Sequence, residues 1–388
     1  MFYQSICKSF DSMSLNQQML HLDAGFMERA ISLAEKGRHT APPNPWVGCV
    51  IVRNGKIVGE GYHIRSGGPH AERHALKAAG PEAEGATAYV TLEPCSHHGK
   101  TPPCVEALIE AKVSRVVVAL EDPDIRVQGK GFALLKDHGI HVESGVCREN
   151  AAKSLMPYLH HRTTGKPYCI IKSATSFDGR TAAADGSSQW ITMEAARIDV
   201  HQLRASSQAI MVGSGTALKD SPSLTARHKI SPEHPQPLRV LLDSTGRVPA
   251  KGALFDINLA QTLVMTSDSA PKERLLEWKK SGCEVEILPR APDGKGVDLH
   301  AALDSLGKRG ILQLMVEGGA ELHGSFLRSG LVDRLSLYIG ACALGSGGMP
   351  LFGGNGPQSI ENASRWKLLN VERMGDDVRM DYIPRGES

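Results

Sequence analysis

The stretch from Pro69 to Cys104 constrains this chain more than any other part of its sequence. It begins Pro-His-Ala-Glu and ends with Pro94, Cys95, a polar segment and Cys104. One imidazole and two thiolates are ligands that zinc prefers, and a catalytic zinc keeps its fourth position open for water. The spacing therefore predicts that His70, Cys95 and Cys104 hold one zinc ion.

Glu72 lies two positions after His70. Side chains two apart on a helix do not face each other, so His70 can bind the metal while Glu72 reaches over the metal-bound water. This pattern predicts that Glu72 carries protons in the zinc-dependent hydrolysis of an amine.

A His-x-Glu pair followed by Pro-Cys-x-x-Cys is the signature of zinc deaminases. Here the second cysteine comes later, because a polar loop from His97 to Thr101 separates Cys95 from Cys104. The alternative is a helix-start histidine and two unrelated buried cysteines. The joint occurrence of Pro94 and the His-x-Glu pair favours zinc.

Composition limits the remaining function classes. A chain of 388 residues is long enough for two domains of ordinary size. Its 44 basic and 42 acidic residues give a formal charge of +2, which does not indicate the basic surface of a dedicated nucleic-acid binder. The eight cysteines are mostly spread singly, as in a reducing cytoplasm, and no run of about 18 apolar residues predicts a membrane span.

The first half predicts a three-layer α/β domain over residues 23–165, preceded by a loose extension over residues 1–22. Asp23 is a plausible N-cap for the first helix, and Asn54-Gly55 is a strong hairpin signal between two apolar runs. Further apolar patterns alternate between strand and helix. The strands are expected near residues 47–52, 56–62, 88–92, 115–120 and 140–143, and the helices near 69–79, 105–111, 131–137 and 148–161.

The segment Thr163-Thr164-Gly165-Lys166-Pro167 predicts a domain boundary. A second α/β domain is expected over residues 166–388, because strand and helix patterns alternate again. Its strands are expected at residues 168–172, 209–212, 238–242 and 311–316, and one helix at 193–206.

Two buried strands of the second half run into glycine-rich turns, at residues 213–216 and 317–322. Exposed backbone N–H groups at such turns suit phosphate oxygens. Each turn alone is more often only a tight turn, and neither is a Gly-x-Gly-x-x-Gly fingerprint. Together they favour a phosphate-bearing cofactor, and Arg204 and Arg227 offer planar forks for a phosphate.

Polar residues near the predicted zinc offer contacts for a substrate, with a turn or solvated role as the alternative for each. Asn44 is the strongest, because the prolines on both sides fix its backbone. The others are His63, His97 and Lys100.

These motifs together resemble the bifunctional deaminase-reductase family of riboflavin biosynthesis. The resemblance covers nearly the whole chain after residue 22 and is carried by residues 44–48, 70–72, 94–104, 176–180, 189–192 and 316–319. It implies an N-terminal cytidine-deaminase-like α/β/α domain followed by a dihydrofolate-reductase-like α/β domain. It also implies a homo-oligomer, a dimer or a tetramer.

The resemblance implies two reactions. Zinc-dependent deamination acts on 2,5-diamino-6-(5-phosphoribosylamino)pyrimidin-4(3H)-one, and NADPH then reduces the ribosyl group of 5-amino-6-(5-phosphoribosylamino)uracil to ribityl. Matching positions implied for NADPH are Ala174, Trp190, Thr216, Asp220, Gly319, Ala320, Glu321, Leu322, His323, Gly324 and Ser325. Those implied for the reductase substrate are Ser188, Arg204, Leu224, Arg227 and Glu317. The sequence does not single out Asp220 as the reductase acid.

Two rival interpretations remain. A nucleic-acid base deaminase with a binding module would carry an excess of basic residues that this chain lacks. A scaffold with structural zinc would need a fourth protein ligand, which would have to be His97 or His98.

Overall fold

The structure is a computed structural model that describes residues 15–97, 102–124, 127–228, 230 and 234–386, and the side chains from residue 21 on. The chain forms two compact units, Met1–Thr164 and Gly165–Ser388. Among the described residues, no helix combines the length and apolar character that crossing a bilayer requires.

The first unit is built on a sheet of five strands in its described part, in the order β2-β1-β3-β4-β5. Strand β1 is antiparallel to β2 and β3, and β3, β4 and β5 are parallel. The elements are α2 (Leu15–Glu35), β1 (Gly48–Arg53), β2 (Lys56–Tyr62), α3 (Ala71–Ala79), η1 (Gly80–Ala83), β3 (Thr87–Val90), α4 (Cys104–Glu110), β4 (Arg115–Val118), α5 (Lys130–Asp137), β5 (His141–Ser144) and α6 (Arg148–Thr164).

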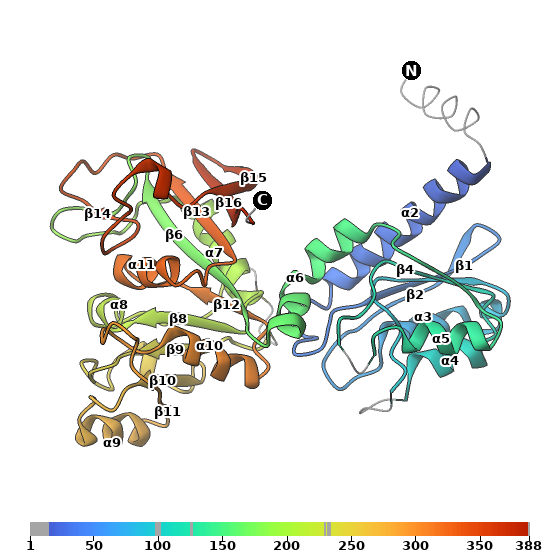
Figure 1. Ribbon diagram of the computed structural model, residues 1–388, viewed down its shortest axis with the longest axis horizontal. Helices are drawn as coiled ribbons and strands as arrows, with labels where there is room; N and C mark the ends of the chain where they lie inside the picture. Colours follow the sequence, from blue (N-terminus) through green and yellow to red (C-terminus); the bar gives the residue numbers. More distant parts are fainter. Residues whose placement is uncertain (1–14, 98–101, 125–126, 229, 231–233, 387–388) are drawn as a thin grey trace. The chain divides into compact units, whose positions relative to one another are not determined.

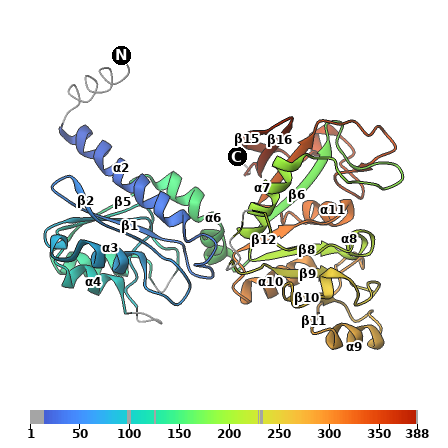
Figure 2. The same ribbon diagram turned by 180° about the vertical axis from the view of Figure 1, so that it is seen from behind.

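Helices cover both faces of this sheet. Figures 1 and 2 show α2 and α6 on one face and α3, α4 and α5 on the other. The hairpin turns at Asn54 and Gly55, with φ of 50° and 73°. This left-handed backbone is what an Asn-Gly turn supplies, so the predicted hairpin and the three-layer architecture are confirmed.

Helix α2 begins at Leu15, earlier than the predicted start at Asp23. The Asp23 carboxylate is only 4% exposed and accepts hydrogen bonds from Tyr89 Oη at 2.6 Å and Arg115 Nη2 at 2.7 Å. Asp23 is therefore a buried ion-pair partner within the helix and not an N-cap. The expected loose extension is wrong for residues 15–22, whereas residues 1–14 lie outside the described part.

Helix α3 rests directly on the backbone of β2. A Cβ atom at Gly61 would lie 2.4 Å from the Ala71 carbonyl oxygen and 2.5 Å from the Ala75 nitrogen. Only glycine allows such an approach. The position of α3, and of His70 at its N-cap, therefore depends on Gly61.

The second unit contains a sheet of nine strands among its described residues, in the order β11-β10-β9-β8-β12-β6-β13-β16-β15. The elements are β6 (Tyr168–Ser176), β7 (Arg180–Ala182), α7 (Glu194–Ala205), β8 (Ala209–Gly213), α8 (Ser214–Asp220), β9 (Leu238–Leu242), η2 (Ala253–Phe255), β10 (Thr262–Thr266), α9 (Lys272–Lys280), β11 (Glu284–Ile287), α10 (Leu299–Lys308), β12 (Gln313–Val316), α11 (Ala320–Arg328), β13 (Arg334–Gly340), β14 (Met349–Pro350), η3 (Ile360–Asn362), β15 (Trp366–Met374) and β16 (Asp377–Pro384).

The first seven strands of this order are parallel to one another: β11, β10, β9, β8, β12, β6 and β13. The hairpin of β16 and β15 adds two antiparallel strands at one edge. Alternate side chains of one strand enter different cores. Met211 packs with residues of α10 and α11, whereas Ile210 and Val212 pack with residues of α7, α8 and α9. The second unit is thus also an α/β structure with helices on both faces of its sheet.

Candidate active sites

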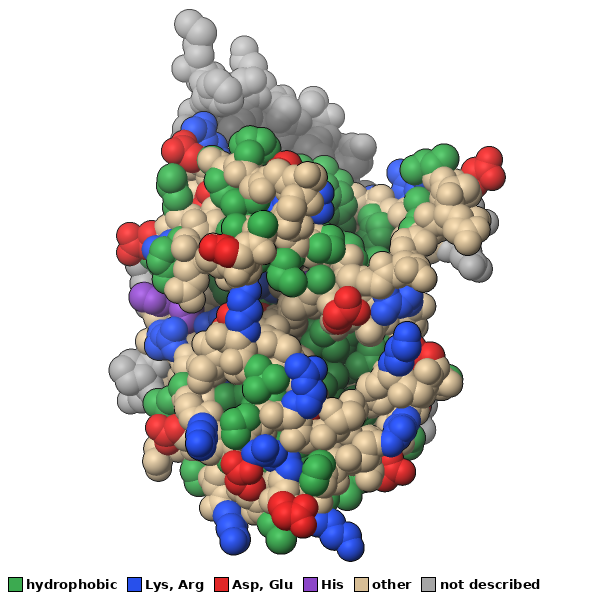
Figure 3. Space-filling view, turned by 90° about the vertical axis from the view of Figure 1, so that its left-hand side faces the viewer, with side chains coloured by type: hydrophobic (Ala, Val, Ile, Leu, Met, Phe, Trp, Pro, Cys, Tyr) green, Lys and Arg blue, Asp and Glu red, His purple; other side chains and the backbone are tan. Residues whose placement is uncertain are grey.

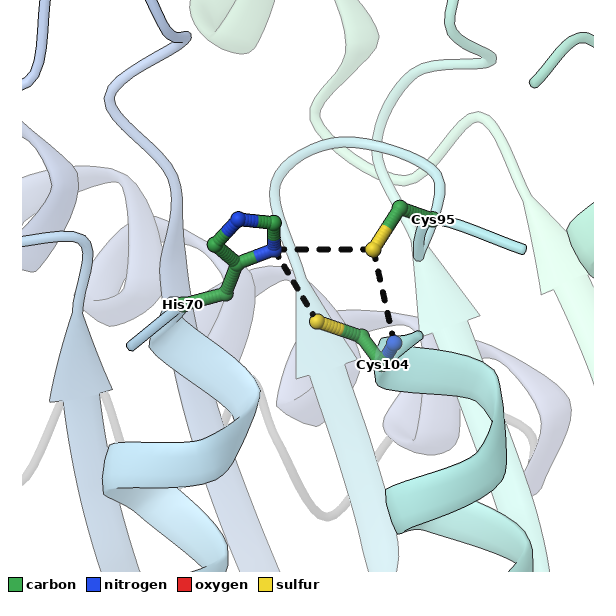
Figure 4. Close-up of side chains that lie close together, drawn as sticks. All are labelled: His70, Cys95 and Cys104. Atoms are coloured by element: carbon green, nitrogen blue, oxygen red, sulfur yellow. Dashed lines mark hydrogen bonds between the residues drawn. The ribbon is translucent and has the colours of Figure 1, made fainter. Parts of the chain in front are cut away.

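Three predicted zinc ligands lie together in the first unit. The ligand atoms of His70, Cys95 and Cys104 all lie within 4.8 Å of one another. His70 Nδ1 is 3.2 Å from Cys104 Sγ and 3.5 Å from Cys95 Sγ, and Figure 4 shows it directed toward both sulfurs.

Three adjacent element ends deliver these side chains. His70 is the N-cap of α3, Cys104 is the first residue of α4, and Cys95 follows β3. The Cys104 backbone N–H donates to Cys95 Sγ at 3.4 Å. The Cys104 thiol, together with His70 and this N–H group, lowers the pKa of Cys95 to about 4. These contacts favour the thiolate form of Cys95, which is the form that binds a metal.

This donor set fits zinc. Two sulfurs and an imidazole nitrogen are the ligands of a three-coordinate protein site that leaves one position open. Within the described ranges, the group of potential ligands that includes His70 contains no fourth member, and His97 is not part of it. His98 lies outside the described residues.

Glu72 lies on the first turn of α3 and is only 3% exposed. Burial raises the pKa of its carboxyl group, and the negative charge of Cys95 acts in the same direction. Its side chain also contacts the Cys104 thiol. A buried carboxyl group beside the ligands is suited to hold and release a proton.

A cavity of about 400 Å³ opens beside these residues. Asn44, His63 and His97 line it together with His70 and Glu72. Asn44 Nδ2 lies 3.2 Å from His63 Nε2, and His63 Nδ1 lies 3.1 Å from the Pro69 carbonyl oxygen. The structure thus brings together three of the four predicted substrate contacts, and the fourth, Lys100, lies outside the described residues.

Sequence reasoning missed several other residues that line this cavity, among them Glu93. Glu93 accepts backbone N–H groups from Asp122, Gly129 and Gly131 at 3.4, 3.1 and 3.0 Å. It therefore ties Asp122, after β4, to Gly129 and Gly131 at the start of α5. Other lining residues that sequence reasoning missed include Asp122, Asp124, Val127, Tyr158 and Arg162. The only signal in the sequence is the polar segment that follows β4.

The two glycine-rich turns of the second unit lie side by side. Strands β8 and β12 are neighbours, and each leads directly into a helix, α8 or α11. A Cβ atom at Gly319 would lie 3.3 Å from Thr216 Oγ1. Figure 3 views the side of the molecule that lies on the left in Figure 1, where a hollow with hydrophobic side chains has both basic and acidic side chains at its rim.

Arg204 and Glu317 form a partly buried ion pair at the end of β12, with their side chains 14% and 10% exposed. Arg204 Nε and Nη2 donate to the two Glu317 oxygens at 2.5 and 2.7 Å. Burial alone would raise the pKa of Glu317, but Arg204 outweighs it and lowers the pKa to about 2. Arg204 also donates to the Thr225 carbonyl at 3.3 Å. This pair therefore joins the end of β12 to the loop after α8.

That loop contains Arg227 and the buried Leu224. Arg227 donates to Ser223 Oγ and, at 2.7 Å, to Thr225 Oγ1. Its backbone N–H donates to His201 Nδ1 at 3.1 Å. The structure thus joins Arg204, Glu317 and Arg227 in one polar group.

The other predicted reductase residues are placed differently. Trp190 is exposed and stacks with the Arg197 guanidinium at 4.5 Å. Ser188 precedes it, Ala174 lies on β6, and residues 320–325 form the start of α11. Asp220 is exposed at the end of α8. In the part of the chain that the structure describes, no hydrogen bond or ion pair joins Asp220 to the Arg204 group.

Lys172 is a residue that sequence reasoning missed. Burial lowers the pKa of its ammonium group, while the nearby Glu317 carboxylate favours the charged form. The sequence signal that could have identified it is a lysine at the end of a predicted strand that is otherwise apolar, residues 168–172. The structure places this cation beside the Arg204 group.

Known proteins match both halves. Residues 21–120 match the family described as the cytidine and deoxycytidylate deaminase zinc-binding region, and residues 167–380 match the RibD C-terminal domain. The riboflavin biosynthesis protein RibD of Chlamydia pneumoniae is 47% identical over 356 residues, which cover 92% of this chain and 94% of that protein. The chain belongs to the RibD family. The corresponding Escherichia coli RibD is 43% identical over 93% of this chain and 99% of its own length.

Solved RibD structures share the fold. Acinetobacter baumannii RibD superposes with a TM-score of 0.86 at 40% identity, covering 95% of this chain and all of the other. A Thermotoga maritima protein titled diaminohydroxyphosphoribosylaminopyrimidine deaminase/5-amino-6-(5-phosphoribosylamino)uracil reductase gives 0.83 at 34% identity, covering 95% of this chain and 100% of that one. These matches confirm the predicted fold class, the zinc-binding deaminase region and a bifunctional RibD enzyme.

Proposed function

We propose that residues 23–165 deaminate 2,5-diamino-6-(5-phosphoribosylamino)pyrimidin-4(3H)-one and that residues 166–388 reduce the resulting 5-amino-6-(5-phosphoribosylamino)uracil. The observation that carries the first assignment is the group formed by His70, Cys95 and Cys104 beside a cavity lined by Glu72. The Thermotoga relative, whose title states both reactions, supports the pairing.

In the deaminase, His70, Cys95 and Cys104 would hold a zinc ion, which would make a water molecule acidic enough to attack near neutral pH. Glu72 would accept a proton and pass it to the departing amine, which leaves as ammonia. Asn44, His63, His97 and Lys100 orient the pyrimidine.

In the reductase, NADPH would supply a hydride to C1 of the ribosyl group, the carbon bonded to the amine nitrogen. The bond from C1 to the ring oxygen would break and that oxygen would take up a proton, which leaves the open ribityl chain. Arg204, Leu224, Arg227, Glu317 and Ser188 hold the substrate. We infer that Lys172, whose charge is favoured by the nearby Glu317 carboxylate, contacts the same substrate. The cofactor contacts are Ala174, Trp190, Thr216, Asp220, Gly319, Ala320, Glu321, Leu322, His323, Gly324 and Ser325.

The proposal extends to the cellular location, the oligomeric state and the substrate class of the enzyme. We expect a cytoplasmic homo-oligomer, either a dimer or a tetramer, that acts on small phosphorylated pyrimidines and not on nucleic acid. The near-neutral charge of +2 supports this substrate class.

Mass spectrometry of the products tests the assignment. The diaminopyrimidine substrate is incubated with the zinc-loaded enzyme, first without and then with NADPH. We expect the deaminated ribosyl compound in the first case and the ribityl compound in the second. An unchanged diaminopyrimidine in both cases would contradict the proposal.

A further inference from the structure

Arg239 on β9 carries a buried charge that neither proposed reaction uses. The residue is 0% exposed. Its guanidinium donates to the carbonyl oxygens of Ala253 at 2.6 Å, Asp256 at 2.9 Å and Ala260 at 2.5 Å. A buried cation is tolerated where such acceptors replace its water. Arg239 therefore organises the backbone of the segment 252–260.

The fourth acceptor of Arg239 lies in a different segment. Arg239 Nη1 also donates to the Ser223 carbonyl oxygen at 3.3 Å. Ser223 belongs to residues 221–227, here named the substrate loop, which carries Leu224 and Arg227. One guanidinium thus links the substrate loop to the segment 252–260.

The same two segments touch at a second point. A Cβ atom at Gly252 would lie 2.3 Å from Ser221 Oγ, and Gly252 has a φ of 81°. The segment 252–260 therefore lies directly against the substrate loop. Fixing this segment also limits where the loop can lie.

The substrate loop has a backbone that needs such support. Ser221 and Leu224 have φ values of 42° and 50°, in the left-handed region that residues with a Cβ atom avoid. Ser223, whose carbonyl Arg239 binds, lies between them. Such a conformation persists only where surrounding contacts hold it.

Other side chains hold the far end of the loop. Gln236 accepts the Ala226 N–H at 2.8 Å and donates to the Ala226 carbonyl at 2.9 Å. His201 accepts the Arg227 N–H at 3.1 Å. Within the described residues, the hydrogen bond from Arg239 is the one that reaches the Ser223 carbonyl, between the two left-handed residues.

We propose that Arg239 is a positioning residue of the reductase, which fixes the substrate loop so that Leu224 and Arg227 meet the phosphorylated sugar. This inference rests on the proposed reductase function. It predicts that Arg239 affects substrate binding more than cofactor binding.

The test compares Arg239→Lys and Arg239→Gln in the full-length, zinc-loaded enzyme. Lysine keeps the charge without the planar fork, whereas glutamine keeps two N–H donors without the charge. Thr262→Val is the matched control. Thr262 Oγ1 is buried and donates to the Leu254 carbonyl at 2.7 Å, so this change weakens the segment 252–260 without removing the bond to Ser223.

Reductase KM, kcat and the NADPH dissociation constant are measured together with the thermal unfolding midpoint. We expect each Arg239 variant to raise KM for the aminouracil phosphate about tenfold, because a charge-assisted hydrogen bond to the loop is lost. The NADPH constant and the deaminase rate should change less than about twofold. Thr262→Val should lower the midpoint with KM unchanged.

An unchanged KM in both Arg239 variants would overturn the inference. So would an equal rise of KM in Thr262→Val, or a parallel rise of the NADPH constant. Hydrogen exchange at the amides of residues 223–227 supplies a readout without substrate, and it should be faster in Arg239→Gln than in wild type and Thr262→Val. Equal exchange would reject the positioning role. A wild-type enzyme that fails to reduce the aminouracil phosphate would instead reject the proposed function.

Discussion

At the scale of single residues, the two sites contain carboxyl groups whose pKa values are shifted in opposite directions, Glu72 upward and Glu317 downward. Burial raises the pKa of Glu72 and favours its protonated form. Glu317 is partly buried, yet Arg204 keeps it ionised, with a pKa of about 2. A proton carrier needs a raised pKa, as Glu72 has, whereas a fixed ion pair needs a carboxylate that stays charged, as Glu317 does beside Arg204. The neighbours of each carboxylate therefore determine its use.

Replacing Glu72 with glutamine should abolish proton transfer while leaving the metal ligands intact. We expect the deaminase kcat to fall by at least about 100-fold, since glutamine cannot accept and release the proton. Zinc content, measured by atomic absorption, and the reductase rate should stay at wild-type values. Deamination at the wild-type rate would show that Glu72 does not carry the proton.

His201 should make the second unit sensitive to mild acid. Burial lowers the pKa of His201 to about 4, and the charges of Arg204, Arg227 and His228 add to this effect. Because the unfolded chain then binds a proton at higher pH than the folded chain, the stability from His201 is complete above about pH 6.5 and is lost as the pH falls toward 4.

We expect the free energy of unfolding to fall by about 1–3 kcal/mol across this pH window through His201. His201→Gln, whose side-chain oxygen can still accept the Arg227 N–H, should lack this component. Urea unfolding of both proteins at about pH 7, 5.5 and 4.5 measures the difference. Parallel pH profiles would contradict the prediction.

At the scale of elements, local patterns predicted the segments that carry the sites. The Asn54-Gly55 hairpin, α3, α4 and the strands β6, β8, β9 and β12 all follow from short-range signals. Strands β10, β11, β13, β15 and β16 were not identified. Strand β15 is exposed along most of its length, so it lacks the alternation that indicates a half-buried strand.

The cavity wall could not be predicted for another reason. Glu93 and the loop after β4 meet only because β3 and β4 are neighbours in the sheet. Nothing in the order of residues indicates which backbone N–H groups a carboxylate will bind. The metal ligands, in contrast, share a motif with fixed spacing. Motif residues were therefore found, and residues that depend on tertiary packing, such as Lys172, were not.

Glu93→Gln tests the role of that loop. An amide group replaces an oxygen that accepts backbone N–H groups, so we expect the free energy of unfolding to fall by about 1–3 kcal/mol. The deaminase KM should rise about tenfold because the cavity wall loosens. Glu84→Gln is the control, since the Glu84 side chain is exposed and its carboxylate lies 3.5 Å from Lys112 Nζ. Equal values in both variants would exclude a positioning role for Glu93.

At the scale of the whole molecule, the two chemistries belong to different compact units. The first unit ends at Thr164 and the second begins at Gly165, close to the expected boundary at residues 165 and 166. Helix α6 continues through Thr164, so the first part of the predicted linker is helical. Each unit has its own core and its own candidate site.

Removal of zinc should therefore abolish the deaminase activity and leave the reductase activity in place. A chelator should abolish deamination, because the amine-releasing site loses its metal. Oxidation of NADPH with the deaminated substrate should stay within about twofold of the untreated rate. Restoring zinc should restore the first activity. Loss of both activities on chelation would show that the reductase also depends on the metal.

The close approach of α3 to β2 has a consequence for attempts to redesign this enzyme. Gly61 lies beneath the helix whose start holds His70, with no room for even one methyl group. Alanine at this position would lift the helix and move the imidazole away from both sulfurs. A library aimed at new amine substrates would thus lose its metal through a mutation in the strand that lies beneath this helix.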